Sequence, residues 1–230
     1  MPPEATTFTR YGVYYTAPGT ALAEFGAGWL GWDMHRACAA PHPDLQGLPL
    51  PVSEITQTPR RYGFHATIVP PFQLAGDLLP LRQALRDYCT RAPAVELQGL
   101  EMAQLGRFLA LVPEQGSHAL HLLAAGAVEA CDTFRVPLAP SDLERHRKRG
   151  LSEAQDRLLI RWGYPYVMQE FRFHMTLTGK HPKAQTRRVR DVLAPRLAPL
   201  LHRPVVIDTL SLVGENEAGF FQVIEDIALS

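Results

Sequence analysis

Residues 61–68 read RYGFHATI, and in them large apolar side chains alternate with polar or small ones. Successive side chains of a β-strand point to opposite faces of the sheet, so this alternation predicts a strand with one buried face and one open face. His65 and Thr67 then lie side by side on the open face, because residues two positions apart share a face.

A second stretch repeats this pattern. Residues 171–178 read FRFHMTLT, which places His174 and Thr176 together on the polar face of another predicted strand. The second histidine follows the first by 109 positions, and the segment VVIDTL at 205–210 follows the similar VELQGL at 95–100 by 110. A nearly constant offset over several elements indicates an internal duplication, with one inserted residue in the second copy.

Each copy is predicted to run strand, helix, strand, strand. The last strands are expected at 108–112 and 220–225, each after a short turn. Between each His-x-Thr strand and its hairpin, apolar residues recur at helical spacing. These residues are Leu78, Leu81, Leu85 and Tyr88 in the first copy, and Val189, Leu193, Leu197 and Leu200 in the second. Pro195 lies inside the second stripe and predicts a kinked or shortened helix.

The predicted fold class is α+β, in which duplicated β-α-β-β lobes form two antiparallel sheets around a central groove, with helices outside. We expect one bilobal domain over residues 1–230. The two predicted lobes lie at about 60–113 and about 170–227. A strand at 11–16 and a helix at 20–38 form an N-terminal unit over 8–38, and connecting helices at 118–134 and 152–162 lie within 114–165. A Ser152–Gln155 capping box begins the second connecting helix, and proline-rich loops are expected at 41–60 and 136–145.

The composition is that of a soluble globular protein, with 46% hydrophobic and 20% charged residues. Because 23 basic residues balance 23 acidic ones, the net charge favours a small substrate over RNA and gives no attraction to a membrane. Three scattered cysteines predict no disulfide framework. The N-terminus does not resemble a signal peptide, and no apolar run approaches the roughly 20 residues that span a bilayer. We therefore expect a cytoplasmic protein, and the oligomeric state stays open.

Two His-Thr pairs facing each other suit the cleavage of a phosphodiester. This reaction needs a base to deprotonate the attacking oxygen and an acid to protonate the departing one, and histidine serves both roles near neutral pH. We therefore expect His65 and His174 to be catalytic. Thr67 and Thr176 are expected to donate hydrogen bonds to the phosphate oxygens. Neither a metal nor a cofactor is required by this scheme.

The paired motifs HATI at 65–68 and HMTL at 174–177 resemble the His-x-Thr signatures of the 2H phosphoesterase superfamily, which includes the LigT-like enzymes. More narrowly, RYGFHAT at 61–67, WGYPY at 162–166 and FRFHMTLTG at 171–179 resemble a bacterial branch associated with phosphonate breakdown. The resemblance implies a bilobal fold and cyclic phosphodiesterase activity. The chain departs from the expected pattern after the first motif, where Val-Pro-Pro at 69–71 stands in place of a basic residue.

The phosphonate link suggests a ribose 1,2-cyclic phosphate that carries a 5-phosphate as the substrate. Arg172 shares the face of His174 and is expected to bind a phosphate, since arginine binds phosphate through two parallel hydrogen bonds. Arg61 lies four residues before His65, roughly 13 Å along a strand, and is expected to meet the far end of the substrate. Tyr11 and Tyr166 are further candidates for substrate contacts.

Two other functions stay open at this point. The same histidines suit an RNA-end enzyme that cleaves or joins 2′,3′-cyclic or 2′–5′ phosphodiesters, and a non-catalytic protein that binds a phosphorylated metabolite is the third possibility. The basic run at 145–149 is either a solvated helix end or a flap over an anionic substrate. We interpret the remaining histidines as surface or structural residues: His35, His42, His118, His121, His146, His181 and His202. His118 and His121 share a helical face but lack a third metal ligand.

Overall fold

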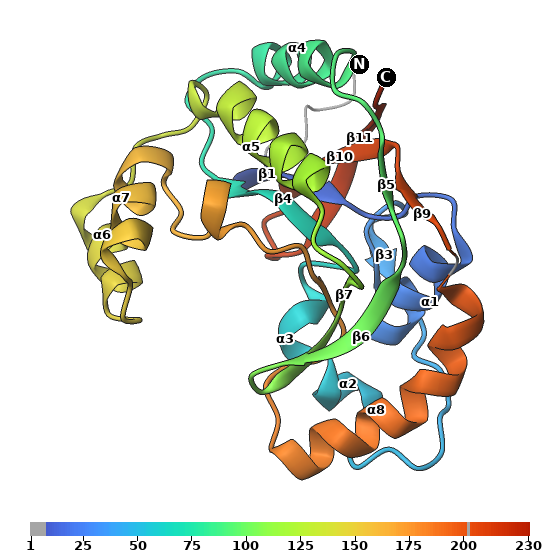
Figure 1. The fold of residues 1–230 in the computed structure, drawn as a ribbon. Coiled ribbons are helices and arrows are strands. Elements are labelled where there is room, and N and C mark those ends of the chain that lie inside the picture. Colours follow the sequence, from blue (N-terminus) through green and yellow to red (C-terminus); the bar gives the residue numbers. More distant parts are fainter. Residues whose placement is uncertain (1–7, 202) are drawn as a thin grey trace.

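The computed structural model describes residues 8–201 and 203–230 (Figure 1). Residues 1–7, on which the signal-peptide prediction rests, lie outside the described residues, as does His202. No helix in the described ranges is both long and apolar enough to cross a bilayer.

A seven-stranded antiparallel sheet runs through the molecule, so the α+β class with antiparallel sheets is confirmed. Its strand order is β11-β10-β1-β4-β8-β7-β6. The strands are β1 Arg10–Tyr15, β4 Ala66–Phe72, β6 Leu100–Leu105, β7 Phe108–Pro113, β8 Met175–Thr176, β10 Thr209–Glu215 and β11 Phe221–Ala228.

The two copies of the repeat exchange strands in this sheet. The second copy's β8 pairs with the first copy's β7, while the second copy's hairpin β10–β11 reaches β4 through β1. The equivalent strands β5 Val95–Leu97 and β9 Val205–Ile207 pair with each other. The two expected sheets are therefore joined, at the pairing of Ala66 in β4 with Met175 in β8.

The helices bury their apolar stripes in one large hydrophobic core. As the sequence predicts, Leu81 and Leu85 of α4 and Val189 and Leu193 of α8 are buried, at 0–1% exposure. The helices are α1 Ala21–Leu30, α2 Val52–Ile55, α3 Gln57–Arg60, α4 Leu78–Cys89, α5 His118–Asp132, α6 Pro140–Arg147, α7 Glu153–Trp162 and α8 Lys183–Leu197, with 3₁₀ turns at Met168–Glu170 and Ala198–Leu200.

The predicted helix at 20–38 is too long. It ends at Leu30 because Gly31 adopts a φ of 80°, and its N–H bonds to the carbonyl of Ala27 as a left-handed cap. The chain then forms the short hairpin of β2 Trp32–Asp33 and β3 Cys38–Ala39. A glycine at the end of an apolar helical pattern is the signal that marks this boundary.

The two predicted His-x-Thr strands are also shorter than expected. Gly63 has a φ of 69°, which interrupts the extended chain, and β4 begins only at Ala66; the second stretch pairs only at Met175 and Thr176. The predicted alternation of burial holds for Phe64, Ala66 and Ile68 in the first stretch, and for Phe171, Phe173, Met175 and Leu177 in the second. It fails at Tyr62, which is only partly buried and packs with Tyr14, and at Thr178, which is buried. An extended segment alternates its side chains whether or not its backbone is paired.

The two proline-rich segments contain helices that the sequence reading missed. The expected loop at 41–60 holds the short α2 and α3, and α6 begins in the loop expected at 136–145. Pro140 is the first residue of α6, a position where its missing N–H costs nothing. The capping box that begins α7 is confirmed. The helix around Pro195 continues to Leu197 before it tightens into the 3₁₀ turn.

The faces of α4 allow a matched test of the core. Leu81 is fully buried whereas Leu79 on the same helix is 68% exposed. We expect Leu81→Ala to lower the free energy of unfolding by about 2–5 kcal/mol, because it leaves a cavity in the core. Leu79→Ala should change it by less than about 0.5 kcal/mol. Urea denaturation of both variants measures this, and equal effects would contradict the placement of α4.

Candidate active site

His65 lies immediately before β4, and both of its ring nitrogens have partners. Nδ1 is 3.0 Å from the carbonyl oxygen of Gly63, and Nε2 is 3.0 Å from Oγ1 of Thr67. Because a carbonyl oxygen can only accept, Nδ1 carries the proton and donates it to Gly63. Nε2 of the neutral ring is then an acceptor, and the Thr67 hydroxyl donates to it.

His174 is held in the same way at the equivalent point of the second copy. Its Nδ1 is 2.9 Å from the carbonyl oxygen of Arg172, again the residue two positions earlier. This contact fixes Nδ1 as a donor in His174 too and leaves Nε2 for chemistry. Each copy of the repeat therefore orients its imidazole with its own backbone, in an extended segment just before a strand.

The strand pairing brings the two His-Thr pairs together. Ala66 and Met175 are direct partners across β4 and β8, and both are fully buried in the core. Continuing this antiparallel register by one residue on each side places His65 opposite Thr176, and Thr67 opposite His174. All four side chains therefore share the face opposite the main core, as neighbours across one strand pair.

The surroundings of His65 keep its imidazole neutral. The ring of Tyr14 stacks on it, with centroids 3.8 Å apart and planes 18° apart. Burial lowers the pKa of His65 to about 4; the hydrogen bond to Gly63 opposes this shift, and the nearby charge of His174 adds to it. At neutral pH the ring is therefore an unprotonated base, and the influence of His174 reflects the closeness of the two rings.

The environment of His174 is more open. Its hydrogen bond to Arg172 lies in an exposed position, and its aromatic neighbour Phe108 of β7 is tilted at a centroid distance of 6.1 Å. Phe108 does not stack on the ring as Tyr14 stacks on His65. The two halves are thus symmetric in backbone geometry and asymmetric in solvation, which suits two different proton-transfer roles.

Of the two predicted substrate-binding tyrosines, Tyr11 does not lie on the side of the sheet that carries the histidines. Its side chain is 7% exposed and packs into the main core, on the face of β1 away from the histidines. Tyr14, an odd number of residues further along β1, points to the opposite face and contacts His65. Tyr166 is exposed, with its ring edge-to-face against Tyr164.

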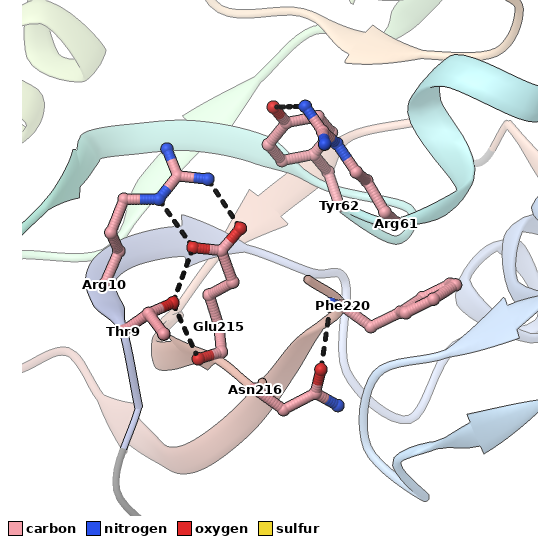
Figure 2. Close-up of polar contacts among 7 residues, drawn as sticks. All are labelled: Thr9, Arg10, Arg61, Tyr62, Glu215, Asn216 and Phe220. Carbon is pink, nitrogen blue, oxygen red and sulfur yellow. Dashed lines mark hydrogen bonds and ion pairs between the residues drawn. The ribbon is translucent and has the colours of Figure 1, made fainter. Parts of the chain in front are cut away.

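Arg61 and Arg172 are both exposed, but only Arg61 has side-chain contacts that place it near His65. Its guanidinium donates to the Tyr62 hydroxyl at 2.8 Å and lies over the Tyr62 ring, which is 6.5 Å from the His65 ring. Figure 2 shows this pair beside a second arginine, Arg10, which makes two 2.6 Å contacts with Glu215.

Sequence reasoning did not assign Tyr14 and Tyr62, whose rings lie near His65, or Arg10 and Glu215, whose charges act on Tyr14, to the site. For Tyr14 the signal was present, because strand alternation already separates it from Tyr11 and Tyr15. For Arg10 and Glu215 no local signal exists. They face each other in the β1–β10 register although 205 positions separate them in the chain.

The basic run at 145–149 forms the end of α6 and the turn after it. Arg145 pairs with Asp142, and Arg147 with Asp156. His146 packs edge-to-face on Tyr164. These contacts tie part of the run to α7 and to the segment before the second motif, while α6 itself has no buried residue.

The other described histidines make local contacts away from the pair. His42 bonds to the carbonyls of Gly28 and Trp29, His121 to that of Ser117, and His181 to that of Ile55. His35 forms an ion pair with Asp226. The described residues contain no group of three or more His, Cys, Asp or Glu that could hold a metal ion. A surface depression lined by residues 42–53 includes none of the predicted site residues.

The low pKa of His65 can be tested by titration. NMR of the ring protons should give a pKa near 4 in the wild type, because burial disfavours the imidazolium. Tyr14→Ala exposes one face of the ring to water and should raise this pKa toward the ordinary value of about 6.5. Tyr15→Ala removes the same volume from the other face of β1 and should leave the pKa unchanged. A wild-type pKa near 6.5 would contradict the assignment.

Comparison with known proteins identifies relatives over most of the chain. Residues 67–222 match a family model described as "Protein of unknown function (DUF1045)". The protein named "Ribose 1,5-bisphosphate phosphokinase PhnN" from Janthinobacterium sp. (strain Marseille) is 34% identical over 93% of this chain, and its namesake from Laribacter hongkongensis (strain HLHK9) is 33% identical over 91%. The chain spans about half the length of these curated relatives, 49% of each.

Solved structures that resemble this one include LigT from E. coli in complex with 3′-AMP, with 15% identity, coverage of 96% of this chain and 98% of that one, and a TM-score of 0.43. TT0787 from Thermus thermophilus has 15% identity, coverage of 96% of this chain and 97% of that one, and a TM-score of 0.46.

Proposed function

The chain belongs to the DUF1045 family, and we propose that it hydrolyses a cyclic phosphodiester on a small sugar phosphate or nucleotide, with His65 and His174 as base and acid. One observation carries this proposal. Both imidazoles are fixed by a backbone carbonyl at Nδ1, lie on one face beside a threonine hydroxyl, and meet across a single strand pairing. A matched acid and base in this arrangement is what cleavage of a phosphodiester requires.

His65 takes the part of the base. With its pKa lowered to about 4, the ring is neutral at pH 7 and its Nε2 can accept a proton. In the proposed step, a water molecule attacks phosphorus and gives its proton to Nε2 of His65. The bond from phosphorus to one ring oxygen of the cyclic ester breaks, and Nε2–H of His174 protonates that departing oxygen. The products are a phosphate monoester and a free hydroxyl, and solvent restores the two proton states.

Thr67 and Thr176 are proposed to stabilise the phosphoryl oxygens. In the free protein the Thr67 hydroxyl donates to Nε2 of His65 at 3.0 Å. When a phosphate binds, this hydroxyl can turn to a non-bridging oxygen and release Nε2 to accept a proton from water. Hydrogen bonds aimed at oxygens that gain charge lower the barrier more than they strengthen ground-state binding.

A phosphorylated ribose is the substrate class we favour. The curated relatives, which are longer proteins, are named for a kinase that acts on ribose 1,5-bisphosphate. The sequence of this chain has no P-loop motif, so the chemistry proposed for it is cleavage of a diester and not transfer from ATP. A ribose 1,2-cyclic phosphate that carries a 5-phosphate, as the phosphonate-associated resemblance suggests, has both the phosphorylated ribose of the relatives' names and a cyclic diester to cleave.

Turnover in the presence of EDTA tests the proposal. We expect hydrolysis of ribose 1,2-cyclic phosphate esters to resist the chelator and to fall by about 10²–10⁴-fold in His65→Ala and in His174→Ala, the usual contribution of a general acid or base. His118→Ala is the matched control, because His118 is exposed on α5 and should leave turnover unchanged.

The same assay separates the competing functions. Faster cleavage of 2′,3′-cyclic ends of RNA, with affinity that falls steeply with salt, would favour an RNA-end enzyme. Binding of the sugar phosphate without turnover would indicate a phosphometabolite-binding protein. If turnover survived in both histidine variants, the catalytic account would be wrong.

A further inference from the structure

The hydroxyl of Tyr14 is buried without a hydrogen-bond partner among the described residues. The side chain is 0% exposed, and its ring is already used in stacking on His65. A buried tyrosine hydroxyl normally finds a hydrogen-bond partner, because leaving it unpaired inside the protein is energetically costly. Burial also raises the pKa of Tyr14 well above its ordinary value, so the hydroxyl keeps its proton and can donate it.

The side chains around this hydroxyl carry both hydrogen-bond donors and acceptors. Tyr62, Arg10, Glu215 and Tyr164 are the charged or titratable groups close enough to influence Tyr14. Figure 2 shows the Arg10–Glu215 and Arg61–Tyr62 pairs next to each other. Arg10, Arg61, Tyr62 and Glu215 together hold two guanidinium groups and one carboxylate, so this cluster carries one net positive charge.

The acceptor in this cluster is already occupied. The Glu215 carboxylate takes bonds from Nε and Nη2 of Arg10 and from the Thr9 hydroxyl. Nη1 of Arg10 takes no part in this ion pair, and the Arg10 side chain also interacts with the Tyr62 hydroxyl. Because Arg61 donates to the oxygen of Tyr62, the proton of the Tyr62 hydroxyl is also available. Several donors and one net positive charge match an anion.

We infer that Tyr14, Tyr62, Arg10 and Arg61 form a subsite for a second phosphate group, a monoester carried by the same substrate. This deepens the proposed function and rests on it for the reaction. In the sheet, β1 and β10 lie on the side of β4 away from β8, so the subsite and His174 flank His65 from opposite sides. A ribose with a cyclic diester at one end and a 5-phosphate at the other has its two anionic groups arranged to fill both places.

Calorimetric titration with ribose 5-phosphate tests the subsite without requiring turnover. We expect the wild type to bind ribose 5-phosphate at least tenfold more tightly than ribose. Tyr14→Phe keeps the ring and deletes the hydroxyl, and it should weaken binding of ribose 5-phosphate about tenfold, as expected for a hydrogen bond to a charged group. Tyr15→Phe is the matched control on the other face of β1 and should bind like the wild type.

Kinetics complete the test. The wild type should prefer ribose 1,2-cyclic phosphate with a 5-phosphate over the same ester without it, and Tyr14→Phe and Arg61→Gln should each reduce this preference about tenfold. Equal binding of ribose 5-phosphate by the Tyr14→Phe and Tyr15→Phe variants would overturn the subsite, whatever the activity. Discrimination in binding with no turnover of either ester would keep the subsite and refute the proposed reaction.

Discussion

The pairing of Ala66 with Met175 is the contact on which the proposed site depends. It joins strands from the two copies of the repeat and turns both residues into the core. Because side chains alternate along an extended chain, the same pairing turns a histidine and a threonine from each copy to the opposite face. Strand exchange between the copies supports it from both sides, with β7 against β8 and β1 against β4. A one-residue slip of β8 against β4 would turn His174 and Thr176 together into the core and separate them from His65 and Thr67.

Symmetry of the backbone does not make the two histidines equivalent. A carbonyl two residues earlier fixes each ring in one tautomer, but only His65 lies against a fully buried aromatic ring. Stacking on Tyr14 removes water from His65, and the pKa falls because the charged form loses hydration. The difference in solvation therefore assigns the base in the proposed reaction, a choice that the two nearly identical motifs leave open.

Local patterns predicted most of the longer elements and the faces of the four central side chains, because alternation and helical spacing can be recognised from neighbouring residues. They missed the short helices α2, α3 and α6 in the proline-rich segments. They predicted the core stripes of α4 and α8 and the polar faces at His65 and His174. They failed where a glycine with positive φ ends an element, as at Gly31 and Gly63. They also failed where distant chain segments meet: the contacts of Arg10 with Glu215 and of Tyr14 with His65 depend on strand order, which no local pattern contains.

The central claim is that two histidines in opposite protonation states cleave the diester, and the pH dependence of kcat/KM tests it most directly. The account predicts that kcat/KM of the wild type falls on the acid side, where His65 becomes protonated near pH 4. His65→Ala should lose this acid-side fall from its residual activity, whereas His174→Ala should lower the activity and keep the fall. An acid-side fall that persists in His65→Ala would contradict the account.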